Sequence, residues 1–432
     1  MAFTPTQSVN SATPQQDVHG TGRNQPNYTP ALTALTVLFF MMGFITCLND
    51  ILIPYLRLIF QLNYTQSMLI NTCFFGAYFF MSIPSGSIIQ KIGYKKGMIL
   101  GFLTAAVACV LFYPAAETKS YGLFLFALFV LATGITLLQV AGNPYVAVLG
   151  QPETASSRLT LTQAFNSLGT FIAPLLGTYL ILSQLPKSTA GIDPSSISPH
   201  AVQTPYLGIA GVLLVISILM AFFKLPVIKP GEDEADNAAN VSGPNYASAW
   251  SAKHLMLGAL GIFCYVGAEV SIGSFLVNFL GLKSVMSMPE HEAGNYVSYY
   301  WGGAMVGRFI GAYVLQKLQP SRVLAFNALA AIVLVLIAMF SSGHVAMFSI
   351  LGVGLFNSVM FSCIFTLALV GLGRHTNQGS GILCTAIVGG ALVPLLQGLI
   401  ADRADLHVAF IIPVICYLYI VYYGVRGHRF KH

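Results

Sequence analysis

The chain has 432 residues, of which 56% are hydrophobic and only 8% are charged. Soluble globular domains carry about 25% charged residues, so this composition excludes that class and indicates a membrane protein with several spans. The formal net charge of +6 does not indicate a nucleic-acid partner, because most Lys and Arg residues lie in short loops beside apolar segments.

Residues 1–30 form a polar stretch rich in Gln, Thr, Asn and Pro, which predicts a disordered tail. This stretch lacks the short basic segment and the small-residue cleavage site of a signal peptide, so we expect the first apolar segment to be an uncleaved helix. The seven cysteines all fall in apolar stretches without CxxC spacing, so they predict neither a disulfide framework nor a metal site.

A helix needs about 20 apolar residues to cross a bilayer. The sequence contains twelve such segments, at residues 32–58, 66–90, 97–115, 121–149, 158–184, 204–224, 252–281, 294–317, 322–341, 345–372, 378–401 and 407–426. A polar break with Pro226, Pro230 and an acidic run separates the first six from the last six. We therefore predict two six-helix bundles at 31–224 and 251–426, a linker at 225–250 and a tail at 427–432.

The distribution of basic residues predicts that both termini are cytoplasmic. With the N-terminus inside, most of the 20 Lys and Arg residues fall in cytoplasmic loops or tails, as the positive-inside rule requires. The residues that fall outside are Arg57, Lys119, Lys187, Lys283 and Arg403. On this orientation the linker at 225–250 is also cytoplasmic.

The two halves resemble each other in sequence. The loop Gln90–Lys96 after the second segment matches Gln316–Arg322 after the eighth, and Ile172–Gly177 in the fifth resembles Leu392–Gly398 in the eleventh. Both matches fall at nearly the same spacing, which predicts a parallel duplication. Transporters built in this way bind their substrate near the bilayer midplane, between halves that rock against each other.

Two acidic residues lie inside predicted spans, one in each half. Asp50 lies in the apolar segment 31–56 and Glu269 in 262–277. An ionised side chain at the bilayer centre costs about 2.5–3.5 kcal/mol on translocon scales, so such residues are rare and usually line a pathway. An interfacial or packing role is the alternative for Asp50. The recurrence in both halves favours transport.

Further polar side chains recur in the spans at spacings of three or four residues, which places pairs on one helix face. These pairs are Gln139 with Asn143, Gln163 with Asn166, and Tyr265 with Glu269, and Asn357 is a weaker addition. A single amide in a membrane helix is most often an interhelical hydrogen bond. Clustered amides and carboxylates suit a polyhydroxylated neutral solute, because their oxygens accept hydrogen bonds from hydroxyl groups and amide nitrogens donate to them.

An anionic substrate would require uncompensated cations in the spans, and only Arg308 lies inside one. We predict that Arg308 is a structural or gating cation near the inner end of the eighth helix. The loop cations Lys91, Lys95 and Lys96 have two interpretations, a gating role or simple positive-inside topology.

The glycine-led basic loops after the second and eighth helices resemble the signature loop of the major facilitator superfamily, although the usual acidic residue is missing at Ile92–Gly93. Segments 39–54, 137–150, 163–169 and 263–276 resemble the fucose/glucose–galactose branch of that family, and the similarity covers nearly the whole chain. It implies an all-α membrane protein of twelve transmembrane helices in two pseudo-symmetric six-helix bundles. It also implies alternating access in a bacterial inner (cytoplasmic) membrane.

In the fucose–proton symporters of this branch, the aspartate of a Leu-Asn-Asp motif and a helix 4 glutamate are the functional acids. Asp50 matches the aspartate, whereas Gln139 stands at the helix 4 position and cannot carry a proton. Proton coupling would therefore use Asp50 or Glu269. A sodium ion held by Asp50, Asn49 and Thr46 is the alternative, because hard cations prefer oxygen ligands.

We thus predict a monomeric Na⁺- or H⁺-coupled symporter that imports a neutral hexose, glucose or galactose, without a cofactor and with membrane lipid around it. The predicted substrate-binding residues are Gln139, Asn143, Gln163, Asn166, Tyr265, Glu269 and Asn357. The alternatives are a fucose or N-acetylglucosamine carrier, a proton-driven multidrug exporter and a non-transporting sugar sensor. A membrane enzyme is disfavoured, because the nine histidines lie at helix ends, in loops and in tails.

Overall fold

The structure is a computed structural model that describes residues 28–60, 64–180, 200–223, 225–226 and 246–429. Within its helices, the side chains at 48–55, 57–59, 64–69, 71, 174–180, 200–201 and 290–291 are outside the description. Most of the predicted tail at 1–30 and linker at 225–250 also lies outside it. The described part of the chain consists of helices joined by loops and turns, and it contains no strand.

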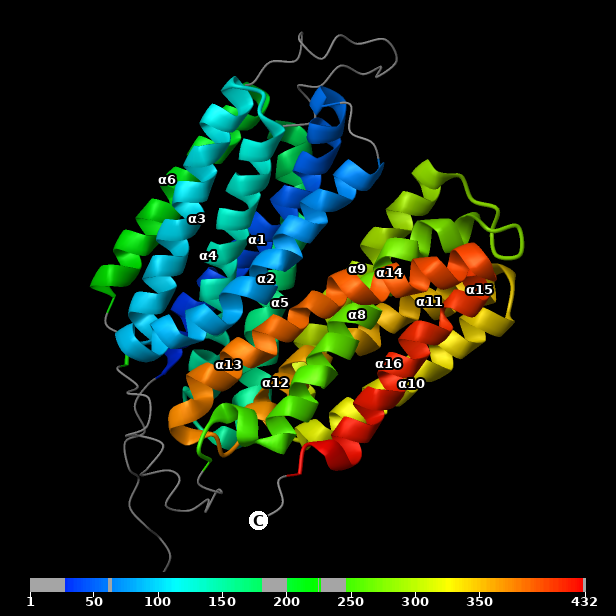
Figure 1. Cartoon of the computed structure of the whole chain (residues 1–432). Helices are drawn as coiled ribbons and strands as arrows, with labels where there is room; N and C mark the ends of the chain where they lie inside the picture. The colour runs from blue at the N-terminus through cyan, green and yellow to red at the C-terminus, as the bar shows by residue number, and fades with distance from the viewer. Residues whose placement is uncertain (1–27, 61–63, 181–199, 224, 227–245, 430–432) are drawn as a thin grey trace, which may run out of the picture.

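Six long helices form the first bundle: α1 (Thr29–Phe60), α2 (Tyr64–Ile92), α3 (Tyr94–Glu117), α4 (Tyr121–Val148), α5 (Ala155–Leu180) and α6 (His200–Phe222). Six spans form the second bundle: α8 (Lys253–Gly281), α9 (Glu290–Val314), α10 (Pro320–Phe340), α11 (Gly343–Asn357) with α12 (Met360–Leu369), α13 (Thr376–Thr385) with α14 (Gly389–Arg403), and α15 (Leu406–Ala409) with α16 (Ile411–Tyr422). These confirm the twelve predicted spans and their arrangement in two bundles (Figure 1).

Ten of the twelve spans are long and apolar enough to cross a membrane by length and composition of their described residues. The other two, α5 and α9, carry polar residues: Gln163 and Asn166 lie in the middle of α5, and Arg308 lies toward the end of α9. These two helices also pack against each other, one from each bundle. The most polar helices therefore face the interior of the transporter, where charged and amide groups avoid lipid.

Equivalent helices make equivalent contacts in the two bundles. The packing of α1 on α5 in the first bundle corresponds to α8 on α14 in the second, and α3 on α6 corresponds to α10 on α16. Between the bundles, α5 packs on α9 and α2 packs on α13, which are again equivalent pairs. This pattern confirms the pseudo-symmetry that the repeated sequence segments predict.

The tenth span is interrupted, where the sequence predicts one continuous helix over 345–372. It is divided into α11 and α12 at Ser358 and Val359, and Val359 leaves ideal helical geometry with φ −99° and ψ −8°. The carbonyl oxygen of Ser358 accepts a hydrogen bond from Nε of Arg308, at 3.4 Å. A broken membrane helix exposes backbone groups that need partners inside the protein, and Arg308 supplies one.

The two bundles are held together at one end by hydroxyl groups. Ser156 and Thr366 lie with their oxygens 2.5 Å apart, Ser157 donates to the carbonyl oxygen of Ala312, and Ser380 donates to that of Val140 at 3.0 Å. In Figure 1 the second-bundle helices at this contact, α12 and α13, lie toward the lower part of the molecule, and the ribbons of the two bundles diverge toward the upper end. The arrangement closes one side of the space between the bundles.

Within the first bundle, α1 and α5 approach each other at glycines. A Cβ atom added to Gly43 would overlap the carbonyl oxygen of Asn166, and one added to Gly169 would overlap that of Phe40. Small residues allow such backbone approach between membrane helices. The contact fixes the rotation of α5, so that Asn166 donates from Nδ2 to the carbonyl oxygen of Phe39, at 3.0 Å.

Candidate substrate-binding pocket

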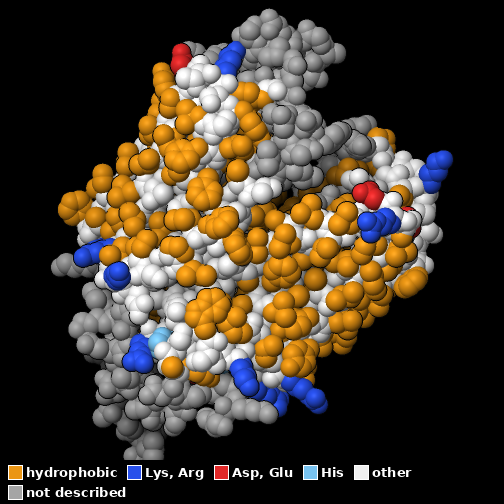
Figure 2. Space-filling view, viewed as in Figure 1, with side chains coloured by type: hydrophobic (Ala, Val, Ile, Leu, Met, Phe, Trp, Pro, Cys, Tyr) orange, Lys and Arg blue, Asp and Glu red, His pale blue; other side chains and the backbone are white. Residues whose placement is uncertain are grey.

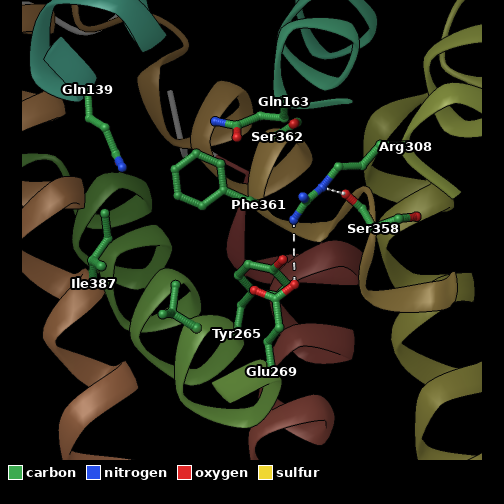
Figure 3. A pocket seen from close by; sticks show the side chains of 10 residues that line it. Gln139, Gln163, Tyr265, Glu269, Arg308, Ser358, Phe361, Ser362 and Ile387 are labelled. Carbon is green, nitrogen blue, oxygen red and sulfur yellow. Dashed lines mark hydrogen bonds and ion pairs between the residues drawn. The ribbon is translucent and has the colours of Figure 1, made fainter. Parts of the chain in front are cut away.

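A pocket of about 140 Å³ lies between the two bundles (Figure 3). Its lining comes from α4 and α5 in the first bundle. In the second bundle it comes from α8, α9, α12, the break in the tenth span and the short 3₁₀ segment Ala386–Val388 between α13 and α14. The lining residues are Gln139, Gln163, Tyr265, Val266, Glu269, Arg308, Ser358, Phe361, Ser362 and Ile387. Sites for drug-sized ligands are typically ~300–1,000 Å³, so this volume suits a compact solute.

Arg308 and Glu269 form an ion pair in the pocket, with Nη2 of the arginine 3.5 Å from Oε1 of the glutamate. Their side chains are only 13% and 10% exposed. Nη1 of Arg308 also donates to the hydroxyl oxygen of Ser167 on α5, in the other bundle. Arg308 therefore connects α9 with the broken tenth span, with Glu269 on α8 and with the first bundle.

Tyr265 and Glu269 point into the pocket side by side from consecutive turns of α8 (Figure 3). The ring of Tyr265 lies 6.4 Å from that of Phe361, centroid to centroid. The hydroxyl of Tyr265, Oε1 of Glu269 and the hydroxyl of Ser362 have no hydrogen-bond partner among the described residues. Oε1 of Glu269 is also the oxygen that pairs with Arg308, so the hydroxyls of Tyr265 and Ser362 are the positions left for hydrogen bonds with a ligand, because buried polar atoms are almost always satisfied.

The first bundle contributes amides to the opposite wall. Gln139 donates from Nε2 to the hydroxyl of Tyr78, at 2.9 Å, which fixes its side chain. Gln163 donates from Nε2 to Oδ1 of Asn143, at 3.4 Å. Asn143 is fully buried behind Gln163, and its Nδ2 has no partner among the described residues. The pocket therefore has glutamine amides on the wall from the first bundle. The wall from the second bundle carries a carboxylate, a phenol and hydroxyls.

Of the residues predicted for substrate and gating, Gln139, Gln163, Tyr265, Glu269 and Arg308 line the pocket. The others lie outside its lining. Asn143 contacts Gln163 from behind, and Asn166 faces α1. Asn357 is buried in a network behind Glu269: its Nδ2 donates to the hydroxyl of Tyr300, at 2.9 Å, and its Oδ1 accepts from the hydroxyl of Tyr417, at 2.7 Å.

The Tyr300 hydroxyl in turn donates to the carbonyl oxygen of Glu269, at 3.1 Å. Asn357 thus supports the backbone that carries the pocket carboxylate. In this structure its side chain bonds to two tyrosines, and its predicted contact with substrate stays a prediction.

The predicted coupling site lies on α1. The side chains of Asn49 and Asp50 are outside the described residues, so their predicted roles and the possible sodium site remain predictions. The hydroxyl of Thr46 donates to the carbonyl oxygen of Met42 at 2.8 Å. Among the described residues, no group of three or more His, Cys, Asp or Glu side chains is placed to hold a metal ion.

The basic loop after α2 lies away from the pocket. Lys95 donates from Nζ to the carbonyl oxygen of Ala221 at the end of α6, at 2.8 Å, while Lys91 and Lys96 are exposed. These contacts join α3 to α6 within one bundle. The gating role of the three lysines stays a prediction.

Five lining residues were not predicted: Val266, Ser358, Phe361, Ser362 and Ile387. The two serines are four residues apart in an apolar segment next to Asn357, the same spacing that identified the pair Gln139 and Asn143. The four-residue spacing of the two serines could therefore have predicted them from the sequence. The apolar residues carry no comparable signal, since valine, phenylalanine and isoleucine are common throughout membrane spans.

Comparison with known proteins places the chain in a family. Residues 34–387 match the sequence profile of the Major Facilitator Superfamily. The glucose/galactose transporter of Brucella abortus biovar 1 (strain 9-941) is 55% identical over 412 residues, covering 95% of this chain and 97% of that protein. The L-fucose-proton symporter of Escherichia coli (strain K12) is 33% identical over 406 residues, covering 90% of this chain and 91% of that protein.

The fold is also similar to that of a solved transporter. A crystal structure of the superfamily transporter FucP in the outward conformation has a TM-score of 0.83 and 33% sequence identity, and the match covers 94% of this chain and 100% of that one. Sequence and structure therefore agree: the chain belongs to the major facilitator superfamily of membrane transporters, and it is not an enzyme.

Proposed function

We propose that the protein is a cation-coupled symporter that imports a neutral hexose of the glucose/galactose type. The observation that carries this proposal is the chemistry of the pocket, where two glutamine amides face a carboxylate, a phenol and hydroxyls. Such groups accept hydrogen bonds from sugar hydroxyls and donate hydrogen bonds to them. The relative at 55% identity is named a glucose/galactose transporter, which supports the same substrate class.

The charge of the pocket favours a neutral substrate. Glu269 and Arg308 are the charged residues of its lining, and they neutralise each other across 3.5 Å. A charged substrate would have to break this pair and leave one of the two buried charges uncompensated, which is costly. A neutral polyol can instead hydrogen-bond to the hydroxyls of Tyr265 and Ser362 and leave this pair intact.

Cation coupling is assigned to Asp50. Because Glu269 is paired with Arg308, Asp50 is the intramembrane acid left for a proton or a sodium ion. The relative at 33% identity is named an L-fucose-proton symporter, which supports a proton as the coupling ion. An oxygen-rich site of Asp50, Asn49 and Thr46 would instead suit a sodium ion, because hard cations prefer oxygen ligands.

The protein would lie in a bacterial inner membrane with both termini in the cytoplasm. Lys and Arg side chains gather toward the lower end of the molecule in Figure 2, the end where Figure 1 places the C-terminus. By the positive-inside rule this end is cytoplasmic. The hydroxyl contacts between the bundles lie toward the same end, so the conformation described is closed to the cytoplasm.

Counterflow of radiolabelled glucose in proteoliposomes tests the substrate assignment, with unlabelled galactose, fucose and N-acetylglucosamine as competitors. Gln163→Ala removes a pocket amide, and Gln316→Ala removes an exposed amide outside it as the matched control. We expect Gln163→Ala to weaken glucose binding about tenfold, the effect of one lost hydrogen bond to a buried site. The substrate assignment fails if fucose or N-acetylglucosamine competes better than galactose, or if both variants behave alike.

A further inference from the structure

A second cavity, larger than the transport pocket, opens on the second bundle. It has a volume of about 470 Å³ and lies between α9, α10 and the junction of α11 and α12. Most of its lining is apolar. The residues are Gly307, Ile310, Gly311, Val314, Leu318, Arg322, Val323, Phe326, Asn327, Leu355, Phe356, Ser358 and Val359, and we call this cavity the α9–α10 groove.

The groove faces the membrane. Phe326, Ile310 and Leu318 in its walls are 64%, 55% and 55% exposed. Exposed apolar side chains on the spans of a membrane protein lie against lipid tails. Along α9 the groove runs from Gly307 to Val314, and at about 1.5 Å per residue it is roughly 10 Å deep from the helix end toward the bilayer centre.

Close helix packing shapes the inner wall of the groove. A Cβ atom at Gly307 would lie 2.5 Å from the carbonyl oxygen of Leu355, and one at Gly311 would overlap the side chain of Val359. These glycines hold α9 against the α11–α12 junction and leave no side chain to fill the groove from that side. The cavity is therefore built into the packing of these helices.

One cation stands at the mouth of the groove. Arg322 lies in the first turn of α10, is exposed, and its guanidinium has no ion pair or hydrogen bond within the described part of the chain. The neighbouring loop cation differs, because Lys317 donates to the hydroxyl of Tyr313, at 2.7 Å, and lies over its ring. Arg322 is thus a charged residue at a helix end. The apolar part of the groove lining lies beside it, and we call that part the slot.

We propose that the α9–α10 groove binds an anionic phospholipid, with its phosphate on Arg322 and an acyl chain in the slot. Arginine recognises phosphate oxygens through paired N–H groups, and basic residues beside grooves between membrane helices bind anionic headgroups. A zwitterionic lipid also carries an ammonium group, whose positive charge offsets that of its phosphate. Its headgroup is therefore attracted to Arg322 less strongly than an anionic headgroup. The charge and the shape together select this occupant.

The bound lipid would contact the transport machinery. Ser358 lines both the groove and the substrate pocket, and its carbonyl oxygen holds Arg308. An acyl chain against Ser358 and Val359 would support the helix break that positions the pocket cation. The binding proposal itself does not depend on which substrate the pocket accepts.

Native mass spectrometry of the purified full chain tests the proposal with phosphatidylglycerol and phosphatidylcholine of the same acyl chains. Arg322→Gln should lower retention of phosphatidylglycerol about fivefold, the factor expected for one cation at a headgroup. Arg426→Gln removes an exposed cation outside the groove and should change nothing. Val314→Phe fills the slot with the charge intact and should also lower retention, whereas Val345→Phe on the exposed face of α11 should not.

Three results would overturn the lipid site. They are equal retention in Arg322→Gln and Arg426→Gln, equal binding of the two lipids by the unmodified protein, and displacement of the lipid by millimolar inorganic phosphate. The last would identify a site for free anions that makes no use of the slot. Val314→Phe keeps the proposal testable if Arg322→Gln does not fold.

Discussion

Arg308 lies 3.5 Å from Glu269, measured from Nη2 to Oε1, in a pocket where both side chains are nearly buried. The same guanidinium reaches Ser167 in the first bundle and Ser358 at the break in the tenth span. A single side chain thus joins the pocket carboxylate to both bundles. Movement of one bundle against the other must change at least one of these contacts.

The first prediction concerns this ion pair. Arg308→Gln leaves the buried carboxylate of Glu269 without its partner, and breaking a buried pair in this way typically costs about 3–5 kcal/mol. We expect a large fall in thermal stability in detergent. The double variant Arg308→Gln with Glu269→Gln removes both charges and should recover most of the loss. Equal stability of the single and double variants would show that the two charges do not interact.

The second prediction concerns coupling. Asp50→Asn removes the proposed carrier of the proton or sodium ion, so gradient-driven accumulation of glucose should be lost while counterflow persists. The measurement is the ratio of accumulated to external sugar in proteoliposomes. Asp402→Asn, at an exposed acid near the end of α14, is the control and should accumulate sugar normally. Normal accumulation by Asp50→Asn would remove Asp50 from the coupling mechanism.

The third prediction concerns helix packing in the first bundle. Gly43→Ala places a methyl group on the backbone of Asn166, and overpacking of this kind costs about 1–3 kcal/mol. Gly76→Ala is the matched control, because a Cβ atom there meets nothing within 4 Å. We expect a lower Tm for Gly43→Ala and an unchanged or slightly higher Tm for Gly76→Ala, since alanine favours helix. Similar Tm values would mean that α1 and α5 are not in close contact.

The fourth prediction concerns the hydroxyl contacts that close one end of the transporter. Ser156 and Thr366 lie on opposite bundles with their side-chain oxygens 2.5 Å apart. A double cysteine variant at these positions should form a disulfide on mild oxidation and stop uptake, and reduction should restore it. Each single cysteine variant serves as the control. Uptake that continues in the fully cross-linked protein would show that this contact does not open during transport.

The sequence predicted the fold because twelve apolar segments, a polar break and repeated loops are direct consequences of bilayer thickness and gene duplication. It also identified the polar residues of the pocket on α4, α5 and α8. Helical spacing shows which side chains share a face, but it does not show what that face contacts. Gln163 therefore lines the pocket, whereas Asn166, three residues later, bonds to α1.

The placement of Arg308 in the pocket could not be predicted for a related reason. Its contacts are with Ser167, Glu269 and Ser358, which are far apart in the chain and meet only when the bundles pack. The break at Ser358 carries no proline, so nothing local marks it. Asn357, next to this break, resembled a ligand-binding amide by composition, and its two tyrosine partners come from α9 and α16.

The central claim is cation-driven import of a neutral hexose. Uptake of radiolabelled glucose into proteoliposomes, under a sodium gradient or a proton gradient imposed separately, tests it most directly. We predict that one of the two gradients drives accumulation above the external concentration and that unlabelled galactose suppresses it. Absence of glucose uptake under both gradients would contradict the account.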